Sequence, residues 1–249
     1  MNPNMANREV AELTFVDYST KKPFLFLDYA NTTSYDLTGE SVFAYGGQGH
    51  PARVSFTGER GGTLTIETQI QPFKLYEMIT GGTMSDSGSF MKREEITVGA
   101  SGVITLGATP TGEVSFFKKD DDMGEALVAS PEEGSTTSYT AEGVVENDIV
   151  VAYYLTALTG IVKRINIKNT SFPRAFTVYG ETIYKTEDDE ILPMKLIYYK
   201  LQPQASISVS MANTGDPATL TITCDLMVDS DGNLMDMIEI IDDTPIVSA

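Results

Sequence analysis

Apolar and polar residues alternate along most of this 249-residue chain, as they do in β-strands with one buried face. In residues 63–70 (TLTIETQI), for example, Leu64, Ile66 and Ile70 fall on one side. β-Branched and aromatic residues are frequent in these runs, and Gly, Pro, Asn and Asp separate them. Many short strands separated by turns predict an all-β fold, an antiparallel β-sandwich or partial barrel.

The strand patterns are clearest in the first and last thirds of the chain. Residues 58–62 (GERGG) predict the turn of a hairpin between strands at 52–57 and 63–70. Residues 229–233 (DSDGN) predict a hairpin turn between two long strands, with Gly232 at positive φ. The other expected strands lie around Leu13 and Phe15 and at 23–29, 148–155, 161–167, 175–184, 193–200, 205–211, 218–228 and 234–241.

One segment, residues 71–82, breaks the alternation. Pro72 suits the first turn of a helix. Apolar residues at helical spacing follow it, and two glycines supply a stop. These residues are Leu75, Met78, Ile79, Gly81 and Gly82. They predict one short amphipathic helix that packs on a sheet.

The middle of the chain is less regular. Residues 83–95 are rich in Gly, Ser, Thr and Met, and we expect them to form a loop. Residues 96–150 contain short strand patterns broken by turns, without a clear linker on either side. We therefore expect a single domain spanning residues 1–249, with a candidate inserted β subdomain at about 96–150.

Global composition limits the class of protein. Hydrophobic residues make up 41% of the chain, as in a globular protein. No run approaches the roughly 20 apolar residues that span a membrane. The first seven residues lack a charged segment followed by an apolar one, so no secretory signal is expected. The single cysteine, Cys224, fits assembly in a reducing cytoplasm.

The chain is strongly acidic. It has 17 Lys and Arg against 35 Asp and Glu, a formal net charge of −18. The stretches 120–148 and 225–249 are acidic and contain no Lys or Arg. Because nucleic-acid binders neutralise phosphates with clustered basic residues, this balance disfavours direct binding to nucleic acid. Solubility is the simplest explanation, and a surface that faces nucleic acid without adhering is the sharper one.

No motif for catalysis, a cofactor or a metal is complete. His50 has no second histidine to share a metal, and residues 46–49 (GGQG) lack the Lys and Ser/Thr of a phosphate-binding loop. Residues 229–233 fail as a calcium loop, because Met227 and Ile238 would occupy ligand positions. Cys224 shares strand parity with apolar neighbours and is expected to be buried. We therefore predict no catalytic, cofactor-binding or metal residues.

Two segments resemble the tail tube proteins of long-tailed bacteriophages. The first comprises residues 53–58 (RVSFTG) and 61–70 (GGTLTIETQI), followed by the short helix ending at 81–82. The second comprises residues 218–228 (ATLTITCDLMV), the Asp/Gly turn and residues 234–238 (LMDMI). The resemblance covers the flanking two thirds of the chain and is weakest at about 96–150.

This resemblance implies a virion protein of the phage tail, assembled in the host cytoplasm. Members of that family form a β-sandwich or partial barrel flanked by a short helix. Six subunits close a ring, and stacked rings form a hollow tube with an acidic lumen. The implied partners are other copies of the chain and tail proteins such as sheath, terminator or baseplate components. DNA would pass through without specific binding, and no membrane or active site is implied. We expect part of the acidic stretch 225–249 to face the lumen.

Two other classes of function stay open from the sequence. One is a capsid decoration protein or an immunoglobulin-type adhesin module, since many short strands follow residue 96. The other is a β-sandwich carbohydrate-active enzyme, because carboxylates are plentiful and cannot be paired from sequence. The absence of Trp, a common sugar-stacking residue, weighs against the enzyme.

Overall fold

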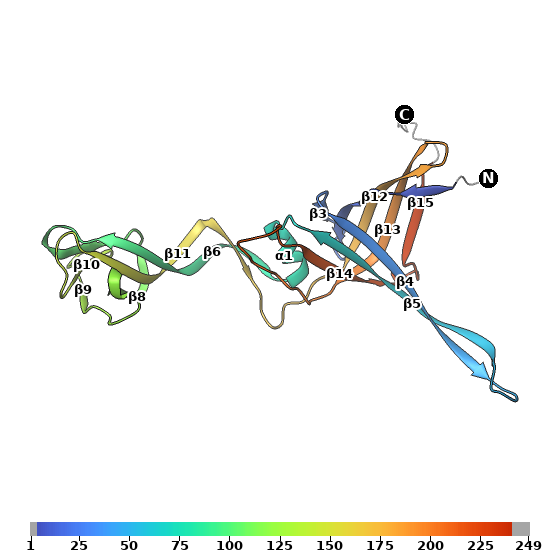
Figure 1. Ribbon diagram of the computed structural model, residues 1–249, viewed down its shortest axis with the longest axis horizontal. Coiled ribbons are helices and arrows are strands. Elements are labelled where there is room, and N and C mark those ends of the chain that lie inside the picture. The colour runs from blue at the N-terminus through green and yellow to red at the C-terminus, as the bar shows by residue number, and fades with distance from the viewer. Residues whose placement is uncertain (1–3, 241–249) are drawn as a thin grey trace. The chain divides into compact units, whose positions relative to one another are not determined.

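The computed structural model describes residues 4–240, which divide into two compact units. The main unit combines the residues up to Gly82 with those from Ile167 onward. The inserted unit runs from Thr83 to Asn166. In Figure 1 the main unit contains the blue and orange strands, and the inserted unit is green to yellow. The inserted unit is longer than the subdomain expected at about 96–150.

The main unit is built on one nine-stranded sheet whose neighbouring strands are all antiparallel. The order is β3-β2-β12-β13-β14-β5-β4, with β1 beside β12 and β15 beside β13. The two end strands do not pair, so within residues 4–240 the sheet forms no closed barrel. The predicted all-β antiparallel sandwich is confirmed. The strands are β1 Met5–Asn7, β2 Glu12–Asp17, β3 Pro23–Leu27, β4 Thr32–Tyr45, β5 Ala52–Thr68, β12 Phe176–Thr186, β13 Ile191–Pro203, β14 Leu220–Met227 and β15 Met235–Glu239.

The core of the main unit gathers the inward-facing side chains of these strands. Alternate residues are buried along β2 and β14, as the period-two pattern predicts. Phe15 and Phe176 meet edge to face, with ring centroids 5.9 Å apart. The most buried core residues of the sheet are Leu13, Phe15, Leu27, Leu64, Ile66, Phe176, Val178, Tyr198, Leu201, Leu220, Ile222 and Cys224.

The predicted helix is confirmed as α1 (Phe73–Thr80), and it packs on this core. It ends at Gly81, whose φ of 63° lies in the left-handed region that favours glycine. A Cβ atom at Gly81 would also lie 2.1 Å from the carbonyl oxygen of Phe172, so a side chain is excluded there. The apolar side chains that α1 buries are Leu75, Met78 and Ile79.

The hairpin predicted at residues 229–233 is wrong, because the strands on either side of this loop pair with the same edge of β13. β14 pairs with residues 200–203 of β13, and β15 continues along residues 194–198. The chain therefore keeps its direction, and the loop bulges out opposite Tyr199. Gly232 does adopt positive φ, at 84°.

The hairpin turn predicted at residues 58–62 is also wrong. β5 continues through these glycines, with an irregularity in its pairing at residues 58–59, and the chain reverses at residues 46–51 instead. Gly62 lies so close to β4 that a Cβ atom there would be 2.2 Å from the carbonyl oxygen of Asp36. These glycines mark a close approach of two strands, which sequence alone does not distinguish from a turn.

Two loop and strand assignments differ as well. Residues 83–95, expected to form a loop, belong to the long strand β6 (Thr83–Thr97). Its pairing with β11 (Ile149–Asn166) overrides the weak strand propensity of Gly and Ser. Residues 205–211, expected to form a strand, have no regular structure.

The inserted unit consists of two three-stranded sheets around a small core of its own. One sheet has the order β6-β11-β8, and the other has the order β7-β10-β9. Short 3-10 turns lie at Ala100–Gly102 and Lys119–Asp121. The remaining strands are β7 Val103–Thr105, β8 Pro110–Lys118, β9 Ala129–Pro131 and β10 Ser138–Ala141. The buried core is formed by Val98, Ile104, Leu106, Phe116, Val150, Ala152 and Tyr154.

Candidate assembly surfaces

The residues considered as catalytic or metal-binding candidates lie in a turn and in the core of the main unit. His50 is exposed in the β4–β5 turn, with a φ of 48°. Cys224 is buried in the main core, and this burial raises the pKa of its thiol to about 12. Because the thiolate is the reactive form, Cys224 is inert at neutral pH. Within residues 4–240, no group of three or more His, Cys, Asp or Glu side chains is placed to hold a metal ion.

The aspartates singled out in the sequence form turns. The carboxylate of Asp229 accepts hydrogen bonds from the backbone N–H groups of Asp231 and Asn233, at 2.9 and 2.8 Å. The contact from Asn233 contributes most to lowering the pKa of Asp229. Asp121 accepts a hydrogen bond from the N–H of Glu125 at 3.3 Å. These side chains stabilise local loops, as Asp commonly does.

The β4–β5 hairpin extends beyond the sheet of the main unit. β14 pairs with β5 only at residues 62–68, whereas β4 and β5 pair with each other as far as Tyr45 and Ala52. Residues 38–45 and 52–61 therefore form a two-stranded ribbon, beside which no third strand lies among residues 4–240 (Figure 1). An isolated two-stranded ribbon is at best marginally stable in water.

This ribbon exposes large apolar side chains on both of its faces. Val42 lies opposite Phe56, and its neighbour Phe43 lies opposite Ser55 on the other face. The exposed fractions are 65% for Val42, 59% for Phe56 and 64% for Tyr45. Apolar patches of this kind mark surfaces that another molecule covers. The exposed apolar residues of the hairpin are Leu37, Val42, Phe43, Tyr45, Val54 and Phe56.

A second surface is formed by β1, β12, β13 and β15, which we call the four-stranded end. Here β1 extends one edge of β12 beyond β2, which pairs with residues 176–181, and β15 extends one edge of β13 beyond β14. There β1 pairs with residues 184–186 of β12, and β15 pairs with residues 194–198 of β13. The order at this end is β1-β12-β13-β15. Within the described residues, the outer edges of β1 and β15 have no strand partner, so their backbone N–H and C=O groups can pair with another chain.

The face of this four-stranded end that points away from the core is mixed in character. Glu181 lies opposite Lys195 and forms an ion pair with it at 2.6 Å. The hydroxyl of Tyr199 donates to Asp236 at 2.5 Å, and this hydrogen bond raises the pKa of the tyrosine. Exposed apolar residues lie between these polar groups. They are Tyr179, Ile183, Ile191 and Ile238.

A protein-family match covers nearly the whole chain. A family model described as the YomU/Tube protein family matches residues 8–240, which include the whole inserted unit. The chain belongs to the YomU/Tube protein family. This confirms the resemblance to phage tail tube proteins that the two flanking segments carry. Tube-family membership identifies a structural protein of the phage tail, and a tube subunit must present surfaces to further copies.

One further comparison and one structural finding complete this description. No curated protein matches the chain with significant sequence similarity. Among the described residues, no helix is long and apolar enough to cross a membrane.

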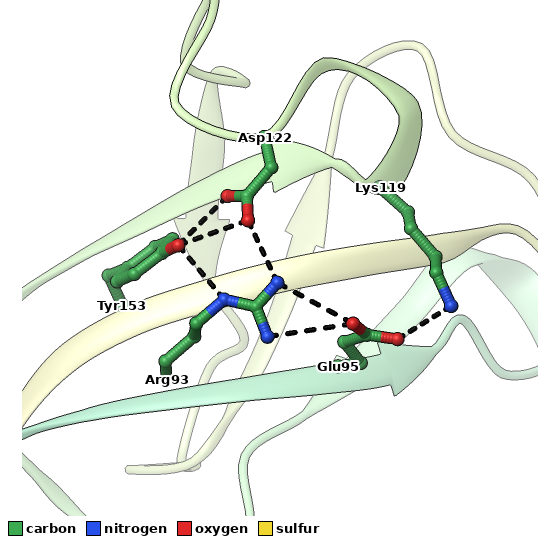
Figure 2. A network of polar contacts seen from close by, with 5 residues as sticks. All are labelled: Arg93, Glu95, Lys119, Asp122 and Tyr153. Carbon is green, nitrogen blue, oxygen red and sulfur yellow. Dashed lines mark hydrogen bonds and ion pairs between the residues drawn. The ribbon is translucent and has the colours of Figure 1, made fainter. Parts of the chain in front are cut away.

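The inserted unit of this tube-family protein carries a polar network on one face of its β6-β11-β8 sheet (Figure 2). Arg93 donates to Asp122 at 2.8 Å and to the hydroxyl of Tyr153 at 3.0 Å. The Tyr153 hydroxyl in turn donates to Asp122 at 3.0 Å. Glu95 contacts Arg93 and forms an ion pair with Lys119 at 2.7 Å. The network fastens the loop at 119–122 to the sheet.

The charges of this network shift one another's pKa values. The hydrogen bond from Arg93 lowers the pKa of Asp122, and the contact with Lys119 lowers the pKa of Glu95. All of these groups are at least partly open to solvent, so each pair stabilises only modestly. The network therefore links the loop at 119–122 to the strands at the surface of the inserted unit. The acidic residues of this loop did not predict the network from sequence.

The sequence contained a signal for the hairpin surface that was not recognised. Residues 41–45 (SVFAY) and 52–56 (ARVSF) both have strand propensity, and apolar residues fall on both of their faces. A strand that is apolar on both faces indicates burial on both faces. In an otherwise alternating chain, this departure distinguishes the hairpin from the half-buried strands of the main sheet.

Proposed function

We propose that the protein is the repeating subunit of a phage tail tube. Six copies close a ring, and the rings stack into a hollow conduit for the genome. The exposed apolar hairpin β4–β5 carries the proposal, because it is unfavourable in a free monomer and favourable against a further copy. It gives each subunit an arm that buries its apolar residues in the assembly.

Ring closure uses the four-stranded end of the main sheet. The free edge of β1 in one copy pairs with the free edge of β15 in the next. Such a head-to-tail contact repeats until the rotation closes a ring. The continuous sheet that results covers the free edges of β1 and β15, which removes two sites of aggregation.

The face of this sheet that points away from the core then lines the conduit. It carries the acidic Asp236, and its lysines Lys195 and Lys185 are paired with Glu181 and Asp189. Together with the net charge of −18, this lining lets DNA pass without specific binding. Asp242 and Asp243, which the expected acidic lining also included, lie outside the described residues.

The protein acts as a virion component assembled in the host cytoplasm, with other tail proteins such as sheath, terminator or baseplate components at the ends or outside of the tube. It works without a catalytic centre, cofactor or metal. Each of these properties follows from membership of the proposed tube.

Electron microscopy of the concentrated protein tests the proposal. Wild-type protein is expected to form hollow cylinders or six-membered rings. Phe56→Asp places a charge on the apolar hairpin and is expected to abolish cylinders while the fold, followed by circular dichroism, is retained. Val128→Asp is the matched control, because Val128 is 67% exposed in the inserted unit. It is expected to assemble normally.

Two results would contradict the tube. The first is a wild-type protein that stays monomeric at every concentration and is absent from virion tails. The second is binding to preformed capsids without self-assembly, which would favour a decoration protein instead.

A further inference from the structure

Residues 205–211 (ASISVSM) have a strand sequence without a strand partner. Serines alternate with apolar residues over the whole segment, which is the period-two pattern of a half-buried strand. The segment lies between the end of β13 at Pro203 and the start of β14 at Leu220. Among the described residues, none from 205 to 217 makes a backbone–backbone hydrogen bond.

The surroundings of this segment are unfavourable in a single copy. Met211 is 92% exposed and Val209 is 40% exposed, while Ile207 packs against the main core. Residues 204–215 contain no charged side chain. A neutral, β-branched segment with free backbone groups is well suited to add to the edge of a sheet.

The main sheet offers one edge that lacks the usual protection. Among the described residues β3 pairs only with β2. It begins with a proline, Pro23, but the four residues after it contain no charge, and Phe26 is 53% exposed. Native edges are commonly protected by charges or by shortness. The other free edges follow that rule, since β1 has three residues and β4 and β15 each carry acidic side chains.

We propose that residues 205–211 of one copy add as an extra strand to the free edge of β3 in a second copy. This contact rests on the proposed self-assembly and adds an interface to it, separate from the hairpin and from the β1 and β15 edges. Each chain carries one donor segment and one acceptor edge, so every copy gives a strand and receives one. Such a contact is head-to-tail and suits a ring or a filament.

The side-chain pattern of the two segments is complementary. Leu25 and Leu27 of β3 face the main core, and Phe26 points to the opposite side. If Ile207 exchanges its packing on its own core for the core of the second copy, and Val209 and Met211 lie with it beside the two leucines, the three serines fall on the side of Phe26. The added strand would bury exposed apolar surface and pair backbone groups on both chains.

Cysteine cross-linking tests this register. Ser206→Cys, Ser208→Cys and Ser210→Cys are made separately, and each is mixed with a tagged Phe26→Cys variant under mild oxidation. A disulfide-linked heterodimer is expected for one of the three serine positions, because cross-strand neighbours lie about 4.5–5.5 Å apart. Ser230→Cys, in the exposed loop 229–233, is the control and should not cross-link. Since the two cysteines are on different chains, any heterodimer reports a contact between copies.

A proline variant provides an independent measurement. Val209→Pro removes a backbone donor within the segment, whereas Ala212→Pro is the control just outside the alternating pattern. Val209→Pro is expected to raise the concentration needed for assembly by about tenfold, equivalent to roughly 1.4 kcal/mol per contact. Ala212→Pro is expected to leave it unchanged.

The outcomes separate this inference from the proposed function. If wild-type tubes form, no serine position cross-links to Phe26→Cys and Val209→Pro assembles like wild type, the added strand is excluded and the tube stands. A heterodimer at one serine position supports the added strand even where no tube is seen. Equal cross-linking of all three serines and the Ser230 control would also overturn it, because such contact is nonspecific.

Discussion

The main unit and the inserted unit resolve the same problem, an antiparallel sheet with exposed faces, in different ways. The main unit has a large aromatic and aliphatic core under α1, yet leaves its hairpin and several edges without partners. The inserted unit has a small core and fastens an outer face with a polar network. In the proposed tube the main unit is completed by neighbouring copies, whereas the inserted unit pairs polar groups of its surface within one chain.

The largest difference in stability between the units should appear when a large side chain is removed from each core. Phe176→Ala removes a fully buried ring that packs edge to face on Phe15, and it should cost about 3–5 kcal/mol of main-unit stability. Phe116→Ala should melt the inserted unit and spare the main one. Urea unfolding measures both effects when hydrogen exchange is used to monitor each unit separately.

Phe26→Ala is the control for these variants, because its ring is 53% exposed and its loss should change stability little. If Phe116→Ala destabilised both units equally, they would unfold as one cooperative body, and the comparison drawn above would fail.

A smaller effect is expected at Asp17, a buried charge of the main unit. Its carboxylate accepts hydrogen bonds from the N–H and hydroxyl of Thr20, at 2.8 and 3.0 Å, and from Arg174 at 3.0 Å. The backbone N–H of Thr20 contributes most to lowering the pKa of Asp17. Asp17→Ala should cost about 1–3 kcal/mol through these lost hydrogen bonds. Thermal unfolding measures the loss.

The lowered pKa also fixes the direction of the pH dependence. A carboxyl with a lower pKa when folded stabilises the protein above its unfolded pKa of about 3.9. That stabilisation is lost as the pH falls through the folded value. Wild type should therefore lose more stability than Asp17→Ala on acidification, and Asp188→Ala, at an exposed position, should behave like wild type. Parallel acid curves for wild type and Asp17→Ala would refute the role of Asp17.

The sequence predicted what alternation and local turn chemistry determine. It predicted the all-β class, the short helix and the positive φ of Gly232. It did not predict which strands pair with each other in the sheet. Residues 229–233 look like a hairpin turn, but β14 and β15 follow one edge of β13, and only long-range pairing decides between the two. Gly58, Gly61 and Gly62 resemble a turn but lie inside β5.

The assembly surfaces were hidden for a related reason. The alternation of apolar and polar residues indicates which face of a strand is buried. It does not show whether that face is buried within one chain or against another copy. Residues 205–211 have the pattern of a strand and no partner, and Phe56 lies in an apolar run that stays exposed. We therefore use the disagreement between sequence pattern and structure as the signal for the proposed contacts with other copies.

The smallest effect is expected for the network of the inserted unit. Arg93→Ala should weaken the attachment of the loop at 119–122 and raise hydrogen exchange there, with little change elsewhere. The pKa values of Asp122 and Glu95 are lowered in the folded protein, so acidification through those values should loosen the loop in the same way. High salt should do so in part, since exposed pairs are screened.

Arg93→Lys is the matched variant for this test. It keeps the charge and loses the planar fork that contacts Asp122, Glu95 and Tyr153 together, so its exchange should fall between wild type and Arg93→Ala. If Arg93→Ala left the loop as protected as wild type, local packing alone would hold it. The two units would then both depend on their cores, and the contrast between them would be confined to the surfaces that the main unit leaves for its neighbours.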